Sequence, residues 1–263
     1  MKKLGLALSA GGSRGVAHIG FLKALEEQGI KPDFIAGTSM GAVIGSCYAK
    51  GCSTDYMIEV IKKLKFGDIF DLSLNPIKNA ALLRSQKMSK QIKKHLGETT
   101  FCELKIPFSC VATDLISGKI VVLGGADEEV CSSVVASASI PSVFKPVQKD
   151  DKLLVDGGVL CRVPIDTVRN MGAQVVVAVD VLGEVRRCEK KPNVFTIMSR
   201  IFDIADSELT HYKTKAQNPD LMIVPDLGDM SQYKFKNIDS AIERGYQTGK
   251  EYASQIKKLI EIE

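Results

Sequence analysis

The sequence predicts an α/β protein in which a mostly parallel sheet is covered by helices on both faces. Short apolar runs typical of buried strands alternate along the chain with segments whose apolar residues recur at helical spacing. Strands that alternate with helices favour a parallel sheet, because each crossover helix packs against one of its faces. The chain carries no internal repeat, low-complexity tract or linker, so we expect one domain over residues 1–263.

The first part of the pattern consists of two strand–loop–helix units. Residues 4–9 are an apolar run closed by glycines, and residues 16–28 have helical spacing and end at Gly29. Residues 33–38 predict a second strand, and residues 40–50 predict a helix of small residues that ends at Gly51. Further helical patterns follow at residues 54–65 and 86–96.

The second part of the chain continues the alternation of strands and helices. Residues 108–112 and 119–123 predict strands, with turn residues at 114–118 between them. A small-residue helix over 130–139 ends at Pro141, and strands follow at 152–155 and 175–181. A long helix over 193–215, a strand over 221–224 and a helix over 238–262 complete the prediction.

Composition excludes several classes of protein. The 263 residues are 45% hydrophobic and 25% charged, which is ordinary for a globular protein, and the net charge of +4 is too weak to indicate a nucleic-acid partner. The seven cysteines form no Cys-x-x-Cys pair and lie mostly in apolar segments, so we interpret them as thiols of a reducing compartment. With only three histidines, we expect no metal site, and no motif implies a cofactor.

The N-terminus imitates a secretory signal, because Met1-Lys2-Lys3 precedes an apolar stretch over residues 4–10. The stretch is at the lower length limit for such a signal and continues directly into a glycine loop, so we interpret it as the first strand. No apolar run approaches the roughly 18 residues that span a bilayer. We therefore expect a cytoplasmic protein that is soluble or peripheral to a membrane.

The segment Gly37-Thr38-Ser39-Met40-Gly41 fits a nucleophile elbow. In that motif a serine lies on a tight strand-to-helix turn, and the flanking glycines let the backbone pack closely. Here the motif lies between a predicted strand and a predicted helix, as the chemistry requires. The alternative is that Ser39 only caps the helix that follows.

The loop Gly11-Gly12-Ser13-Arg14-Gly15 lies between the first strand and the first helix. Free backbone N–H groups and the helix dipole favour negative charge at such a place, so the loop suits an oxyanion. A dinucleotide site is the alternative, but it requires Gly-x-Gly-x-x-Gly and an acidic residue that ends the second strand. The sequence has Ala10 at the first glycine position, and Asp33 precedes the second strand.

A nucleophilic serine needs a base. His211 follows Ser39 in the order found in α/β-hydrolases, but only 38 residues precede Ser39, and both His211 and His95 fall in helices with polar neighbours. Asp156 ends an apolar strand and is followed by two glycines, so a direct Ser–Asp pair and an ordinary Asp-Gly turn are equally compatible with its spacing. Asp180 lies within a strand, and we interpret it as structural.

These motifs, in this order, resemble the patatin-like phospholipase family. The resemblance covers about residues 3–226 and is greatest for small bacterial members related to the patatin-like domain of neuropathy target esterase. It implies a three-layer α/β/α fold with Ser39 as nucleophile, Asp156 of the Asp156-Gly157-Gly158 motif as proton acceptor, and residues 11–15 as the oxyanion hole. Further family-like segments are Gly15-Val16-Ala17-His18-Ile19-Gly20, Ala136-Ser137-Ala138-Ser139-Ile140-Pro141, Val155-Asp156-Gly157-Gly158-Val159 and Val177-Ala178-Val179-Asp180.

The chain departs from the family pattern at two places. Ala10 replaces the usual first glycine of the loop, and Cys161-Arg162-Val163-Pro164 stands where an asparagine commonly precedes the proline. Neither departure removes a reacting group.

The resemblance implies a serine acyl hydrolase that cleaves carboxylic ester bonds of lipids, or other acyl esters, through an acyl-enzyme. Asp156 is then expected to be partly desolvated, because burial raises the pKa of a carboxyl group and makes it a better base. The N–H groups of Gly12 and Ser13, together with that of Met40, are expected to hold the oxyanion. Arg14 is expected to brace the loop, and the alternative is that it contacts a lipid phosphate. The alternatives are a lipid- or protein-binding module on the same fold and a nucleotide-binding protein.

Residues 60–95 form a basic, cap-like segment that is predicted to be helical. Nine basic residues against two acidic ones give a local balance of +7, so the rest of the chain sums to −3 because the whole carries +4. Phenylalanines and leucines lie between the lysines, so the segment fits either contact with an anionic membrane or an ordinary helix pair with a solvated lysine face. Its basic residues are Lys62, Lys63, Lys65, Lys78, Arg84, Lys87, Lys90, Lys93 and Lys94.

Overall fold

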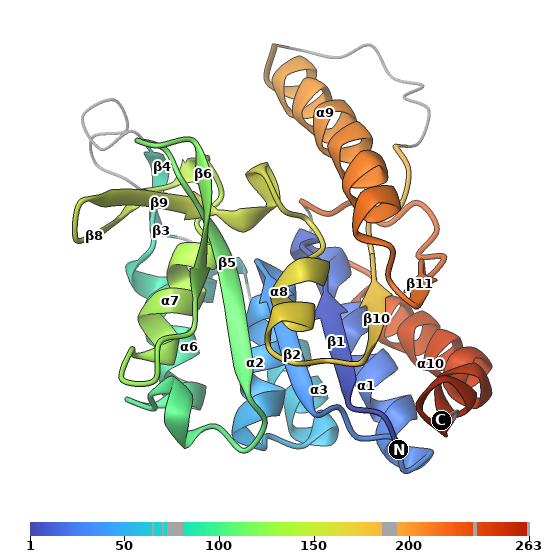
Figure 1. Cartoon of the computed structure of the whole chain (residues 1–263). Coiled ribbons are helices and arrows are strands. Elements are labelled where there is room, and N and C mark those ends of the chain that lie inside the picture. Colours follow the sequence, from blue (N-terminus) through green and yellow to red (C-terminus); the bar gives the residue numbers. More distant parts are fainter. Residues whose placement is uncertain (65, 70, 73–80, 186–193, 234–235, 262–263) are drawn as a thin grey trace.

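The computed structural model describes residues 1–64, 66–69, 71–72, 81–185, 194–233 and 236–261, and its centre is a sheet of eight strands (Figure 1). The strand order is β11-β10-β1-β2-β5-β9-β8, and β6 also pairs with β5. The first five strands of this order are mutually parallel, whereas β6, β8 and β9 pair in antiparallel fashion. The strands are β1 (Leu4–Leu8), β2 (Phe34–Thr38), β5 (Phe108–Asp114), β6 (Lys119–Leu123), β8 (Val147–Lys149), β9 (Lys152–Asp156), β10 (Val175–Val179) and β11 (Leu221–Ile223).

Helices cover both faces of the sheet. Leu6 of β1 points into the larger core, which includes residues of α1 (Ala17–Glu27), α2 (Met40–Lys50) and α10 (Ile238–Glu261). The next residue, Ala7, belongs to a second core beneath α8 (Ile165–Asn170) on the other face. Burial on both faces explains why β1 and β10 are continuous apolar runs instead of alternating ones. The predicted three-layer α/β/α fold with a mostly parallel sheet is confirmed.

The other helices continue these layers. The helix predicted over 86–96 is present with the same ends, and those predicted over 54–65, 193–215 and 238–262 are present with slightly different ends. Residues 65, 193 and 262 lie outside the described part of the chain. The helices not yet named are α3 (Thr54–Lys63), α4 (Phe66–Ile69), α6 (Gln86–Leu96), α7 (Val130–Ser137), α9 (Val194–Gln217) and the 3-10 helices η1 (Gly12–Val16), η2 (Phe101–Glu103) and η3 (Gly157–Val159).

Several short elements were not predicted. A second sheet has the order β3-β4-β7, from β3 (Asp71–Leu72), β4 (Ala81–Arg84) and β7 (Ser142–Phe144). Strands of two to four residues are too short to show a period, and β4 pairs with a strand about 60 residues later. The segment over residues 60–95, which was predicted to be helical, is helical only in part, because β3 and β4 lie between α4 and α6. The small-residue helix predicted over 130–139 ends earlier, at Ser137.

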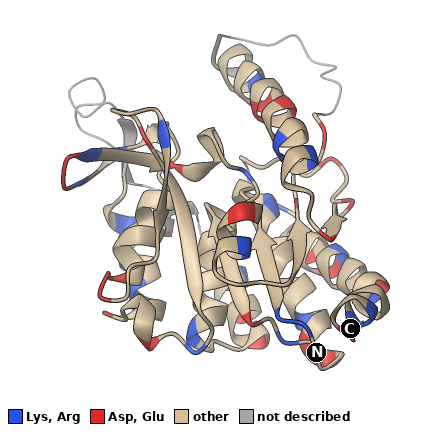
Figure 2. Ribbon diagram, viewed as in Figure 1, with Lys and Arg blue, Asp and Glu red and all other residues tan. Residues whose placement is uncertain are grey.

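Charge is interspersed over the molecule, as the mixed blue and red segments of Figure 2 show for one view. Within the basic segment, Lys62 pairs with Asp239 at 2.7 Å, Lys93 pairs with Glu98 at 3.0 Å, and Lys63 pairs with Glu59. Lys65 and Lys78 lie outside the described residues. Among the helices that the structure describes, none combines the length and the apolarity needed to cross a bilayer.

Candidate active site

Two strands that end facing each other bring Ser39 and Asp156 together. Both strands pair with the same edge of β5. The last pair between β2 and β5 is Thr38 with Val111, and the adjacent residue of β5, Ala112, pairs with Asp156 of β9. The opposite edge of β5 is occupied by β6, so β2 and β9 must share this one. Because β9 is antiparallel to β2, the carboxyl ends of the two strands meet at adjacent positions of β5.

Ser39 lies on a strained strand-to-helix turn, as the predicted nucleophile elbow requires. Its φ of 53° and ψ of −121° place a non-glycine residue at positive φ, between β2 and α2. A Cβ atom at Gly41 would lie 2.3 Å from the Leu8 carbonyl oxygen, which explains the glycine there. The Ser39 N–H donates to Ser137 Oγ at 3.0 Å, and this bond fixes the turn from the neighbouring α7.

Asp156 is in direct contact with the serine. Ser39 Oγ donates to Asp156 Oδ2 at 2.5 Å, and the Gly158 N–H donates to Asp156 Oδ1 at 2.7 Å. The Asp156 side chain is buried, and burial raises its pKa to about 6 although both hydrogen bonds act to lower it. This geometry is that of a hydroxyl next to a carboxylate basic enough to accept its proton near neutral pH.

The glycine loop lies beside the serine as the 3-10 helix η1. Gly12 has a φ of 51° and lines the same cavity as Ser39 and Ser13. Our expectation for the Ser13 N–H is wrong, because that group donates to the Gln232 carbonyl at 2.9 Å. The Gly12 N–H has no hydrogen-bond partner among the described residues, and Met40 supplies the first N–H of α2. These two groups remain as candidate oxyanion donors.

Buried side chains hold the loop in place. Arg14 Nε donates to the Val181 carbonyl at 2.7 Å, and its Nη1 donates to the Met230 carbonyl at 3.2 Å. Burial lowers the pKa of His18 to about 4, so its neutral ring donates through Nε2 to the Ser9 carbonyl at 3.0 Å. Gly15 packs against Met40, since a Cβ atom there would lie 2.4 Å from Met40 Cγ.

Both departures from the family pattern are accommodated. Ala10 lies next to Gly158, where an added Cβ would make an ordinary 3.4 Å contact with the Ala10 Cβ. The Ala10 N–H donates to the Arg162 carbonyl at 2.9 Å. The buried Arg162 side chain contacts Asp180 and Asp206 at 3.5 and 3.2 Å, so it turns away from Ser39 into an ion-pair cluster.

The alternative bases lie elsewhere. Asp180 accepts from the Leu182 N–H and pairs with Arg162. His211 is exposed on α9, in edge contact with Tyr212. His95 lies on α6, and its Nδ1 shares a 2.8 Å hydrogen bond with the Tyr56 hydroxyl. The contacts described for these three side chains are with other residues, whereas Asp156 is hydrogen-bonded to Ser39.

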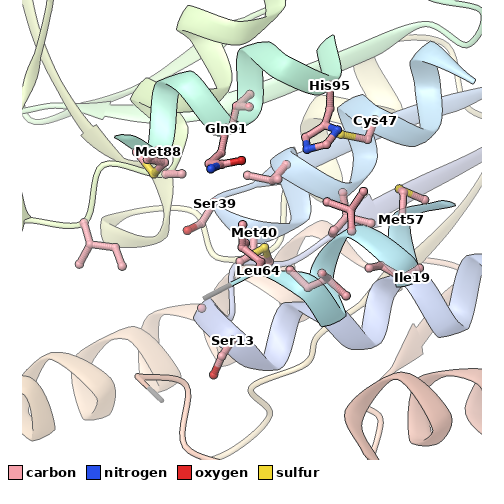
Figure 3. Close-up of a pocket in the computed structure, with 18 of the residues that line it drawn as sticks. Ser13, Ile19, Ser39, Met40, Cys47, Met57, Leu64, Met88, Gln91 and His95 are labelled. Atoms are coloured by element: carbon pink, nitrogen blue, oxygen red, sulfur yellow. The ribbon is translucent and has the colours of Figure 1, made fainter. Parts of the chain in front are cut away.

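A cavity of about 330 Å³ opens beside Ser39 (Figure 3). One face of α2 forms a wall, through Met40, Val43, Ile44 and Cys47 at successive helical turns. At 1.5 Å per residue, Cys47 lies about 12 Å along the helix axis from Ser39. In Figure 3, His95 lies beside Cys47 and away from Ser39. The remaining wall is mostly apolar and comes chiefly from α3, α6 and residues 138–144.

Three residues of the site were missed by sequence reasoning. Ser137 Oγ accepts from the Ser39 N–H, and the Gln232 carbonyl accepts from the Ser13 N–H. Tyr233 lines the cavity together with Gln232. Ser137 lies in a segment that was noted only for its resemblance. Gln232 and Tyr233 lie in a loop about 220 residues from the glycine loop, and a loop carries no periodic pattern that predicts such a contact.

Known proteins are similar to this chain over most of its length. A model of the family described as patatin-like phospholipase matches residues 6–169. An uncharacterised NTE family protein of Mycobacterium bovis is 36% identical over 69% of this chain and 49% of its own length. Neuropathy target esterase sws of Drosophila melanogaster is 30% identical over 97% of this chain and 20% of its own length.

The fold is shared with VipD from Legionella pneumophila, whose crystal structure gives a TM-score of 0.57 at 13% identity, over 97% of this chain and 67% of that one. The chain spans about half the length of the mycobacterial relative. The match over residues 6–169 contains the glycine loop, Ser39 and Asp156. The resemblance seen in the sequence is therefore confirmed, and this chain belongs to the patatin-like phospholipase family.

Proposed function

We propose that this chain is a serine acyl hydrolase that cleaves carboxylic ester bonds of lipids through a Ser39–Asp156 dyad and an acyl-enzyme. The observation that carries the proposal is the 2.5 Å hydrogen bond from Ser39 Oγ to a buried carboxylate, at one end of an apolar cavity. The family assignment supports the same chemistry.

The reaction runs in two steps. Ser39 Oγ attacks the ester carbonyl carbon while Asp156 takes the serine proton, and the Gly12 and Met40 N–H groups stabilise the negative oxygen. The intermediate then expels the alcohol, which takes the proton back from Asp156. Water, deprotonated by the same carboxylate, then attacks the acyl-enzyme. The Ser39 oxygen leaves and takes that proton from Asp156, which releases the fatty acid and restores both side chains.

The cavity supplies the substrate class. Its mostly apolar walls suit an acyl chain extended along α2 from Ser39 towards Cys47. If each methylene group takes about the 30 Å³ share of a water molecule, a cavity of about 330 Å³ holds on the order of ten. We therefore propose esters of medium or long single acyl chains as substrates.

A hydrolysis screen with a labelling control tests this proposal. We expect a fluorophosphonate probe to label the wild-type chain on Ser39 and not to label Ser39→Ala. A panel of phospholipids, lysophospholipids and acylglycerols should then identify a substrate whose hydrolysis Ser39→Ala abolishes. A chain that is neither labelled nor active on any ester would instead be a binding module on the same fold.

The pH dependence follows from Asp156. The carboxylate must be ionised to accept the serine proton, and its pKa is raised to about 6 by burial. We expect kcat/KM for a soluble ester to rise with pH, to reach half its maximum near pH 6, and to stay level above pH 7. A profile that is flat down to pH 4.5 would show that Asp156 is not the base.

A larger side chain at the end of the cavity farthest from Ser39 should shorten the preferred acyl chain. We expect Cys47→Phe to lower kcat/KM for long-chain esters at least tenfold while short-chain esters are cleaved almost normally. Each methylene group that is no longer buried loses about 0.8 kcal/mol, close to fourfold in kcat/KM. The measurement is kcat/KM across a p-nitrophenyl ester series, with the exposed Cys102→Phe as control. An equal loss at every length would contradict this path.

We further propose that the basic segment attracts the enzyme peripherally to anionic lipid, at the cytoplasmic membrane surface. Lys90, Lys93 and Lys94 are exposed on α6, although Lys93 also pairs with Glu98. Each basic residue near such a surface contributes about 1 kcal/mol, and salt screens it. We expect Lys90→Glu/Lys93→Glu/Lys94→Glu to lose the preference for anionic over neutral vesicles in co-sedimentation. An unchanged preference would mean that these lysines form only a solvated helix face.

A further inference from the structure

Helix α9 presents apolar side chains to solvent and polar side chains to the protein. The exposed residues lie between 42% and 64% exposed, and their spacing of three and four residues places them on one stripe of the helix. We call this stripe the α9 apolar face. Surface helices normally have the opposite polarity, and contiguous apolar exposure marks a site of interaction. The α9 apolar face consists of Ile197, Met198, Ile201, Phe202 and Ile204.

Polar contacts on the inner side fix this orientation. The buried Arg162 donates from Nε to Thr210 Oγ1 at 2.9 Å and lies 3.2 Å from Asp206. One turn earlier, Asp203 Oδ1 accepts from Gln232 Nε2 and from the Tyr233 hydroxyl, both at 2.9 Å. A rotation of α9 that buried its apolar face would break these contacts, so the exposure follows from the packing.

The same contacts join α9 to the active site. Gln232 and Tyr233 line the cavity beside Ser39, and the Gln232 carbonyl accepts from the Ser13 N–H of the glycine loop. We call Gln232 and Tyr233 the cavity lip. They contact the inner side of α9, and the α9 apolar face lies on the opposite side of the same helix. Figure 1 shows α9 projecting from the body of the fold.

A second exposed apolar pair lies beyond the same edge of the sheet. Leu115 and Ile116 are 50% and 67% exposed in the turn that follows β5. Because β5 is parallel to β2, with Thr38 opposite Val111, this turn lies past the edge at which Ser39 is found. Two separate apolar patches at the active-site edge suit a broad apolar partner better than a single groove.

We propose that the α9 apolar face inserts into the interfacial layer of a lipid bilayer and holds the cavity lip at residues 232–233 within about 10 Å, one helix diameter, of that surface. The choice of a bilayer rests on the proposed function, since a lipid ester must pass from a lipid phase into the cavity. An amphipathic helix lying in the interface needs no membrane-spanning length. Insertion of this kind depends on apolar contact, and so does not require anionic lipid.

A single tryptophan tests the insertion directly, because the chain contains none. We use the full chain with Ser39→Ala, so that the vesicles are not hydrolysed, and add either Phe202→Trp on the face or Gln255→Trp on the exposed surface of α10. With phosphatidylcholine vesicles we expect a blue shift and quenching by acyl-chain-brominated lipid for Phe202→Trp, and neither for Gln255→Trp. Absence of the shift, or an equal shift at both positions, overturns the proposal.

A polar double variant provides the second measurement. In the Ser39→Ala chain, we expect Ile201→Ser/Phe202→Ser to raise at least tenfold the concentration of phosphatidylcholine vesicles needed for half-maximal co-sedimentation. The same double substitution in the otherwise wild-type chain should leave cleavage of a soluble short-chain ester unchanged. If sedimentation velocity shows instead that the wild type dimerises and this variant does not, a second copy covers the face and the proposal fails. Vesicle binding without any esterase activity would overturn the proposed function while leaving the docking surface intact.

Discussion

Replacing Ser39 by Ala or Asp156 by Asn is expected to lower kcat/KM for ester hydrolysis by about 10⁴-fold in either case, without unfolding the protein. Residues that act as one unit are strongly non-additive, so the double variant should be no slower than either single variant. The physical reason is the 2.5 Å hydrogen bond, since neither group has its chemical role without the other. Steady-state kinetics of the three variants provide the measurement.

Asp156→Asn should in addition stabilise the fold at neutral pH. Folding raises the pKa of Asp156 from 3.8 to about 6, so the folded chain binds more protons between these values and its stability falls as pH rises through them. Above pH 6 the ionised carboxylate costs about 3 kcal/mol relative to the unfolded chain. Asn carries no charge, and its amide can accept from Gly158 and donate to Ser39. We therefore expect Asp156→Asn to raise the melting temperature at pH 7.5 and to do so much less at pH 4.

His211→Ala is the matched control for the dyad, because His211 is exposed on α9. It should stay within a few-fold of wild-type turnover. A variant of Ser39 or Asp156 that kept near wild-type turnover, or a loss in His211→Ala as large as that in Ser39→Ala, would show that the base is a different residue. A lower melting temperature for Asp156→Asn at pH 7.5 would contradict the buried charge.

Local patterns in the sequence were sufficient to predict much of the fold and to indicate one half of the proposed dyad. The strands β1 and β2 are buried on both faces, so they are continuous apolar runs, and glycines mark the turns that follow. Ser39 could be proposed as the nucleophile because the elbow motif is local in the sequence. Spacing alone could not distinguish Asp156 from an ordinary turn residue. Asp156 lies about 120 residues after Ser39, and only the antiparallel pairing of β9 with β5 brings the two side chains together. Only the family resemblance selected Asp156.

Contacts between distant loops account for what the sequence did not predict. The Ser13 N–H was expected to bind the oxyanion, but the carbonyl of Gln232 takes it, and neither residue type indicates that pairing. The polar side of α9 shows the same limitation. Asp203 and Asp206 look like solvated helix residues in the sequence, yet they contact Gln232, Tyr233 and Arg162 inside the protein.

Gly12→Ala is expected to lower kcat about 100-fold or more with a smaller change in KM, because losing one oxyanion donor costs about 3 kcal/mol in the transition state. Gly12 has a φ of 51°, and an added Cβ would lie 2.3 Å from the Gln232 carbonyl oxygen. The backbone cannot yield without moving the Gly12 N–H, which is one of the two candidate oxyanion donors. Kinetics on a soluble ester, beside a thermal melt, give the two quantities needed.

Gly29→Ala separates the oxyanion role from backbone strain. Gly29 has a φ of 70° at the end of α1, and nothing lies within 4 Å of an added Cβ. The left-handed conformation costs an L residue about 1–2 kcal/mol, so Gly29→Ala should lose stability while keeping its turnover. Gly12→Ala should lose stability to a similar degree or more, but its folded fraction should turn over slowly. If Gly12→Ala kept its kcat, or if its loss of activity followed only the fraction unfolded, the Gly12 N–H would have no part in stabilising the oxyanion.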